Sequence, residues 1–194
     1  MLDALHRLSG RIECVERIAV RAFVLALPVM ILANTLGRAM RSPIYWMDEL
    51  AIHCMVWLAM IGLSLTLKTR SAVAVTMLVD AVAPGLMKGM RVVVDLIILA
   101  FALTLLFLCM RWFDPVMLAR AGFDLHEFSG QTFNFMYQDT TATLGMRKFW
   151  FWLIVPVVAL TTSVHAASNL ARTVSAPATA LKAKLASAGS RGLD

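Results

Sequence analysis

The chain has 194 residues, of which 60% are hydrophobic and 15% are charged, and its mean hydropathy is +0.76. Soluble domains contain about 25% charged residues, so this composition excludes both a soluble globular domain and a disordered chain. The formal net charge is +6, but the aromatic residues lie within the apolar runs and not among the basic residues, which excludes a nucleic acid as a partner.

Four long apolar runs, almost free of charge, follow one another along the chain. A helix needs about 20 apolar residues to cross the hydrocarbon core of a bilayer. We therefore predict an all-α, polytopic membrane protein, a single membrane domain with four transmembrane helices and additional amphipathic interfacial helices. Pro28 and Pro156 fall inside the first and fourth runs, where membrane helices tolerate proline with a kink. The predicted spans are residues 18–36, 50–67, 92–110 and 149–167.

The distribution of Lys and Arg predicts the orientation of these spans. Twelve of the 18 basic residues lie in or beside the N-terminal segment, in the segment 68–91 and in the tail 168–194, and six lie in the loops 37–49 and 111–148. Basic residues accumulate on the cytoplasmic side of a membrane protein. We therefore predict that both termini are cytoplasmic and that the two loops lie on the opposite side.

The segments outside the spans carry their own patterns. Residues 1–17 are amphipathic, because Leu5, Leu8 and Ile12 share one helical face. Two interpretations stay open for them, a cytoplasmic arm at the membrane interface and a helical extension of the first span. Between spans two and three we predict a short interfacial helix that ends at Pro84.

The loop 111–148 is long for a connection between two helices of a compact bundle. It contains Phe and Tyr residues throughout, whereas disordered loops are depleted in aromatic side chains. We therefore predict that this loop is folded against another surface.

The sequence contains no recognisable pattern of catalytic residues. It contains no catalytic or nucleotide-binding motif, and its three cysteines do not have metal-ligand spacing, so we predict no catalytic residue, no metal site and no cofactor. Four histidines raise the alternative of a haem-binding subunit. His53 and His165, however, differ in predicted depth by about 18 Å, which is too far for two ligands of one iron.

Arg21 and Asp95 are the ionisable residues in the first turns of spans one and three. Because both spans rise from the cytoplasm in the predicted topology, the two side chains lie at similar depth. They either form an interhelical pair or reach the interface separately. The centres of the spans are otherwise apolar, which indicates a scaffold and not a transport pathway.

The second span and its flanks resemble the small membrane subunit of TRAP (tripartite ATP-independent periplasmic) transporters. That family shows a Trp, an acidic pair that opens the second helix, a Trp-Leu pair, a glycine one turn later and a basic residue at the membrane exit. The residues that match this pattern here are Tyr45-Trp46-Met47-Asp48-Glu49-Leu50, Trp57-Leu58-Ala59-Met60-Ile61-Gly62 and Lys68-Thr69-Arg70.

The approach to the fourth span is similar to the same family, through Thr143-Leu144-Gly145-Met146 and the later Val155-Pro156-Val157. One departure lies between spans two and three. Ala72 and Thr76 occupy the positions of the family's usual His and Asp, so no role of those polar groups can be carried over.

The resemblance implies that the chain is a small scaffold subunit of a secondary active transporter in the bacterial inner membrane, and not an enzyme. It implies two protein partners, a large elevator-type permease subunit and a periplasmic binding protein that delivers an organic acid, with uptake driven by a sodium gradient. The alternative is a haem-bearing or quinone-site membrane anchor of an oxidoreductase.

We expect contact with these partners at the outer end of span two and in the loop 111–148. Trp46 suits a membrane interface, and Glu49 can reach Arg38 or Arg41. The loop either caps this chain and the large subunit permanently or contributes to transient docking of the binding protein. The candidate interface residues are Trp46, Asp48, Glu49, Trp57, Gly62, Phe128, Phe133 and Phe135.

Overall fold

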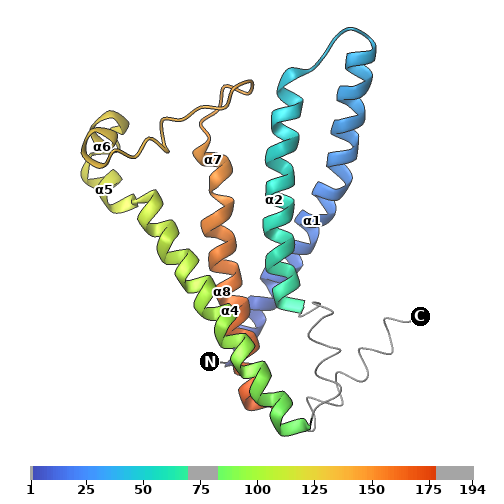
Figure 1. The fold of residues 1–194 in the computed structure, drawn as a ribbon, viewed down its shortest axis with the longest axis vertical. Helices are drawn as coiled ribbons and strands as arrows, with labels where there is room; N and C mark the ends of the chain where they lie inside the picture. The colour runs from blue at the N-terminus through green and yellow to red at the C-terminus, as the bar shows by residue number, and fades with distance from the viewer. Residues whose placement is uncertain (1, 70–82, 178–194) are drawn as a thin grey trace.

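The computed structural model describes residues 2–69 and 83–177, and within these ranges the fold is built from helices (Figure 1). Four helices are long and apolar enough to cross a membrane, which confirms the predicted fold class. The long helices are α1 (Leu2–Ala39), α2 (Tyr45–Thr69), α4 (Pro84–Phe113) and α8 (Ile154–Ser175), and the short ones are α5 (Pro115–Arg120), α6 (Leu125–Thr132) and α7 (Phe149–Trp152).

Helix α8 is the centre of the arrangement, because it contacts α1, α2 and α4. Helices α1 and α2 form a second extensive contact with each other. Figure 1 shows α8 between α4 and the pair α1–α2, and α4 diverging from that pair toward α5 and α6. We call the end where α1 begins and α8 finishes the N-terminal end of the bundle, and the opposite end, which carries α5 and α6, the loop end.

Helix α1 is one unbroken helix of 38 residues, about 57 Å long. Residues 2–17 therefore continue into the first span without a break in the helix, as the interpretation of a helical extension expects. The turn into α2 is tight: Ser42 N–H donates to the Gly37 carbonyl at 2.8 Å. A Cβ on Gly37 would lie only 2.8 Å from the Ser42 carbonyl oxygen, so this turn requires glycine at position 37.

The third span begins earlier than the sequence suggested. Helix α4 starts at Pro84, where the predicted interfacial helix was to end. Proline suits the first turn of a helix because the missing N–H would have no intrahelical partner there. The prediction for residues 70–82 lies outside the described residues, as do Ala72 and Thr76.

The fourth span is interrupted near its start, where α7 ends at Trp152 and α8 begins at Ile154. Pro156 has no N–H to donate to the carbonyl four residues earlier, which lies on Trp152. The chain continues in the same direction, because the Val157 N–H still donates to the Leu153 carbonyl at 3.2 Å. Helix α8 continues to Ser175, eight residues beyond the predicted end at Ala167.

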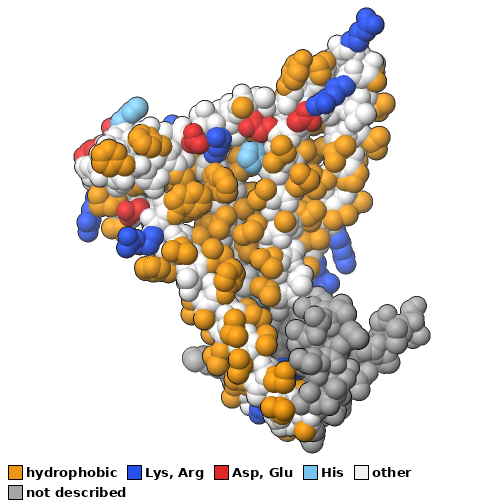
Figure 2. All heavy atoms as spheres, in the orientation of Figure 1, with side chains coloured by type: hydrophobic (Ala, Val, Ile, Leu, Met, Phe, Trp, Pro, Cys, Tyr) orange, Lys and Arg blue, Asp and Glu red, His pale blue; other side chains and the backbone are white. Residues whose placement is uncertain are grey.

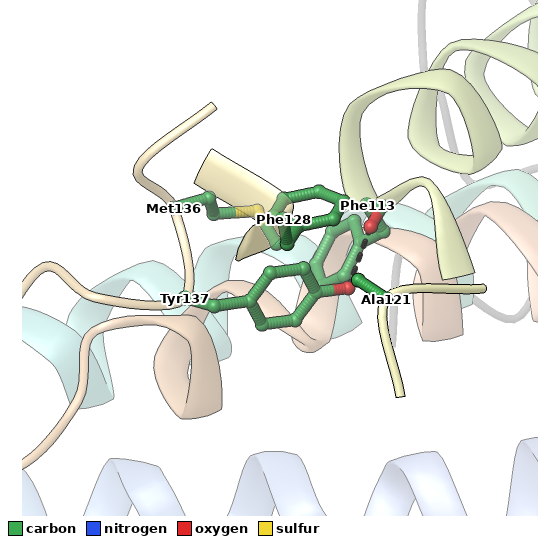
Figure 3. Packing of buried hydrophobic residues seen from close by; sticks show 5 residues of the cluster. All are labelled: Phe113, Ala121, Phe128, Met136 and Tyr137. Carbon is green, nitrogen blue, oxygen red and sulfur yellow. Dashed lines mark hydrogen bonds between the residues drawn. The ribbon is translucent and has the colours of Figure 1, made fainter. Parts of the chain in front are cut away.

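The long loop is folded, and it is folded largely on itself. Asp124 caps α6 by accepting the Glu127 and His126 N–H groups, and these hydrogen bonds lower the pKa of its carboxyl. The Tyr137 hydroxyl donates to the Phe113 carbonyl at 2.6 Å, which ties the loop to the end of α4 (Figure 3). The buried side chains that we call the loop cluster are Phe113, Ala121, Phe128, Met136 and Tyr137.

Phe128 occupies the interior of this loop cluster, where only 1% of its surface is exposed. It packs edge-on against Tyr137, with 5.4 Å between the ring centroids. Its expected role in a partner interface is therefore wrong, because a side chain without exposed surface cannot contact another protein. The sequence could not separate Phe128 from Phe133, which is 83% exposed.

Replacing Phe128 by Ala tests the loop cluster. Removing a fully buried phenylalanine from a small core costs about 3 kcal/mol or more. We expect limited proteolysis of the F128A protein to cleave between residues 114 and 148 far faster than in the wild type, while the helical signal of the four spans persists. The matched control is Phe133→Ala, whose cleavage should follow the wild type, and equal cleavage of the two variants would contradict this assignment.

Candidate functional site

The N-terminal end of the bundle contains a buried polar network that joins three helices. Its centre is His165 on α8, which has no exposed surface. The His165 Nδ1 atom lies 2.8 Å from Ser9 Oγ, and its Nε2 atom lies 3.2 Å from Glu16 Oε2. Both Ser9 and Glu16 belong to α1 and are buried.

Helix α2 completes this network with two side chains. Ser64 donates from Oγ to Glu16 Oε1 at 2.7 Å, and Lys68 donates from Nζ to Ser9 Oγ. A carboxylate only accepts hydrogen bonds, so Nε2 of His165 carries a proton and donates it to Glu16. Ser9 accepts from the ammonium group of Lys68 and can donate its own proton to Nδ1. The hydrogen bonds therefore run in one direction, from Lys68 to Glu16.

The order Ser9–His165–Glu16 has the connectivity of a hydrolase triad, but its surroundings exclude that use in this structure. Ser9 has no exposed surface, so no substrate can reach its hydroxyl oxygen. The arrangement instead pairs a buried cation with a buried carboxylate through two polar side chains from neighbouring helices. Because an unpaired charge is very costly in a protein interior, such a network fixes which helices meet and at what height.

The sequence analysis did not single out Ser9 or Glu16. It considered Lys68 only as the basic residue at the exit of span two, and His165 only as a candidate haem ligand. The sequence of α1 contains one indication of this network. Ser9 and Glu16 are seven residues apart, so they lie two turns apart on the same helical face. Helix α8 carries a similar face, formed by Thr161, His165, Ser168, Asn169 and Thr173.

The structure does not bring Arg21 and Asp95 together. Arg21 is exposed on α1, and Asp95 is buried on α4. Asp95 accepts a hydrogen bond from Thr173 Oγ1 on α8 at 2.6 Å. The alternative of an interhelical pair fails because, among the described helices, α4 packs extensively along α8 only.

The histidines also form no pair of ligands. Both ring nitrogens of His165 are engaged by Ser9 and Glu16, and His53 stacks on Phe151 with 3.9 Å between the ring centroids. Over residues 2–69 and 83–177, no three His, Cys, Asp or Glu side chains come close enough together to hold a metal ion.

The two acidic residues that open α2, Asp48 and Glu49, bind different parts of the chain at the loop end. Asp48 accepts hydrogen bonds from Arg38 and Asn34 of α1. Glu49 turns the other way and accepts the backbone N–H groups of residues 142, 143 and 144 at 2.7–3.1 Å, together with the Thr143 hydroxyl at 2.6 Å. The expected contact of Glu49 with Arg38 or Arg41 is therefore wrong, and Asp48 takes the arginine instead.

The remaining interface candidates differ in how much of their surface is exposed. Trp57 donates from Nε1 to the Phe151 carbonyl at 2.9 Å, so it joins α2 to α7 within the chain. Gly62 is half-buried on α2, and a Cβ placed on it would meet no other atom within 4 Å. Trp46 and Phe133 are exposed, and 58% of the Phe135 surface is accessible.

Apolar surface dominates the outside of the bundle. Figure 2 shows hydrophobic side chains along the visible lengths of the long helices, while charged side chains gather toward the loop end. The exposed apolar side chains of α4 include Val93, Leu96, Ile97, Phe101, Leu103, Phe107 and Leu108. A surface of this kind is stable only against lipid or against another apolar protein surface.

A comparison with protein-family models assigns most of the chain to one family. The model described as "Tripartite ATP-independent periplasmic transporters, DctQ component" matches residues 27–176. The matched part runs from the second half of α1 to the end of α8, so it contains His165 and Glu49, whereas Ser9 and Glu16 precede it. No curated protein sequence matches the chain significantly.

Replacing Glu16 by Ala tests the buried network. The change leaves His165 and Ser64 without their shared acceptor, and breaking a buried charged pair of this kind costs about 2–4 kcal/mol. We expect the free energy of unfolding in detergent micelles to fall by that amount. The control is Glu13→Ala on the same helix, because Glu13 forms only a partly exposed pair with Arg17, worth about 0.5 kcal/mol. A loss as small as the control's would show that the network is not a stabilising contact.

Proposed function

The chain belongs to the DctQ component family of tripartite ATP-independent periplasmic transporters, and on this premise we propose that it is the small scaffold subunit of such a transporter and not an enzyme. The observation that carries the proposal is the family match over residues 27–176. The four spanning helices and the apolar outer surface are consistent with it.

The scaffold role is supported by what lies inside the bundle. The polar network around His165 is closed by α1, α2 and α8, and Ser9 and His165 have no exposed surface. A transport pathway needs polar groups that a substrate can reach near the middle of the membrane. We propose that the substrate and sodium sites belong to a large elevator-type permease subunit, and that this chain enlarges the fixed wall against which that subunit moves.

The same proposal includes two partners and a class of substrate. The large permease subunit would lie against the apolar faces that this chain leaves uncovered, among them the outer face of α4. A periplasmic binding protein would deliver an organic acid from the loop end, and a sodium gradient would drive uptake. The basic residues are distributed as expected for cytoplasmic termini in a bacterial inner membrane.

The interface candidates that the fold leaves exposed are Trp46, Asp48, Phe133 and Phe135, all at the loop end. Glu49 contributes indirectly, because it holds residues 142–144 beside the start of α2. We propose that the segment 111–148 presents Phe133 and Phe135 to a partner. Two uses stay open: a permanent cap on the large subunit and transient docking of the binding protein.

Reporter fusions test the proposed orientation. Fusions at Lys88 and after Arg172 should give cytoplasmic signals, and fusions near Arg41 and Gly130 should give periplasmic signals, because most Lys and Arg residues then face the cytoplasm. A cytoplasmic signal at Gly130 would overturn the orientation.

Replacing Phe133 and Phe135 together by Ser tests the assembly. The loop cluster should stay intact, because neither ring belongs to it. A permanent cap predicts that the complex with the large subunit, purified in detergent, is lost. Transient docking predicts an intact complex whose uptake needs more binding protein to saturate. If assembly and uptake both match those of the wild type, the proposed interface is wrong.

A further inference from the structure

The apolar surface of α4 continues beyond the end of that helix. Helix α4 finishes at Phe113, and α5 begins at Pro115 with one residue between them. Val116 on α5 is 56% exposed, and Phe123, just after α5, is 71% exposed. Neither side chain belongs to the loop cluster. The folding of the loop on itself therefore leaves most of their surface uncovered.

Helix α5 lies at the height of the spanning helices and not above them. Along the vertical axis of Figure 1, α5 is level with α7 and lower than the turn that joins α1 to α2. That turn lies between Ala39 and Tyr45. A bilayer whose normal follows the long helices, and which covers α1 and α2 up to this end, therefore reaches α5 as well. A segment at this height contacts either lipid or another protein.

Three tryptophans lie beside this segment. Trp112 in the last turn of α4 packs edge-on against Trp152 of α7, with 5.4 Å between the ring centroids. The side chains of Trp112, Trp150 and Trp152 are 39–53% exposed. Tryptophan is enriched where a bilayer meets water, because its ring is apolar while its N–H group can bind headgroups. The three indole groups therefore indicate that the headgroup layer lies at the end of α4, where α5 begins.

Two arginines flank the same segment without a carboxylate partner. Arg111 is exposed in the last turn of α4, and Arg120 is exposed at the end of α5. Neither guanidinium group forms an ion pair with a described residue, and Arg120 contacts the Met117 sulfur at 4.0 Å. Figure 2 shows basic side chains on the lower side of the α5 and α6 region. Because a guanidinium group binds phosphate as well as carboxylate, lipid phosphates supply the partner that the chain lacks.

The composition of this segment favours lipid over a second protein as the covering partner. A protein surface would have to supply carboxylates for Arg111 and Arg120, because burying an unpaired charge is costly. The headgroup layer binds both charges without removing them from water, and the acyl chains below it accept Val116 and Phe123. Apolar rings and basic side chains at one height are typical of a segment that lies in a membrane interface.

We propose that α5 and the turn after it, residues 115–123, lie in the headgroup layer of the leaflet at the loop end. Arg111 and Arg120 bind lipid phosphates, while Val116 and Phe123 contact the upper part of the acyl chains. The connecting segment is thus anchored to the membrane along its first part, and this anchor holds the end of α4 where it diverges from α1 and α2. The surface is separate from the rings proposed above for a protein partner, and it does not depend on the transport function.

Spin labels on the full chain, reconstituted in liposomes of phosphatidylethanolamine and phosphatidylglycerol, test this anchor. The variants Val116→Cys, Phe123→Cys and Glu127→Cys each carry one nitroxide, in a chain whose three free cysteines are replaced by alanine. Oxygen concentrates in hydrocarbon, and a nickel chelate stays in water. We expect the labels at positions 116 and 123 to have a ratio of oxygen to chelate collisions severalfold above that of the control label at position 127, which lies on α6 at an exposed acidic residue.

Replacing the two arginines tests the contact with phosphate. In the double variant Arg111→Gln and Arg120→Gln, the ratio of oxygen to chelate collisions at position 123 should fall severalfold, because the segment loses its attachment to the headgroups. The matched control is Arg147→Gln, which removes another exposed arginine of the same connecting segment and should leave the ratio unchanged.

Hydroxyl-radical footprinting of the unaltered chain in the same liposomes gives a second measurement that needs no cysteine variant. Phe123 should be oxidised severalfold more slowly than Phe133, although both rings are exposed in the chain itself. Equal oxidation of the two rings would exclude the anchor. A label at position 123 that collides mainly with the chelate would place α5 in water, and a label protected from both reagents would show that protein and not lipid covers it.

Discussion

His165 is the point at which three of the spanning helices are joined. Each of its ring nitrogens contacts a side chain of α1, and the same two α1 residues, Ser9 and Glu16, contact Lys68 and Ser64 of α2. These groups are buried inside the protein, where an unpaired charge is very costly, so the contacts form only when the helices meet at one register. Apolar packing alone would allow the helices to slide or rotate, because lipid contacts an apolar face as well as another helix does.

The two ends of the bundle therefore differ in how they are held. The N-terminal end is closed by polar contacts among α1, α2 and α8, with Asp95 of α4 joined to α8 through Thr173. At the loop end α4 diverges from α1 and α2 (Figure 1), and the connecting segment 111–148 stabilises itself through its own loop cluster. Glu49 is the main polar tie between that segment and α2.

This division suits a component that works inside a larger assembly. A closed polar end keeps the register of the helices, while the diverging end leaves apolar faces and aromatic side chains available to a partner. The chain belongs to a family of transporter components, and Phe133 and Phe135 are exposed at the diverging end.

The sequence by itself determined the features that depend on composition and local pattern. Long apolar runs can only be spanning helices, and aromatic side chains in the loop 111–148 require a folded segment, so both predictions follow from burial alone. Only the tertiary structure decided which residues contact one another across the chain. Glu49 meets residues 142–144, and His165 meets Ser9, more than 90 positions away along the chain. Helical periodicity indicates which face a residue occupies, but not which helix covers that face. The pairing of Asp48 with Arg38, the burial of Phe128 and the separation of Arg21 from Asp95 all follow from how the helices pack around α8, and no local pattern contains that information.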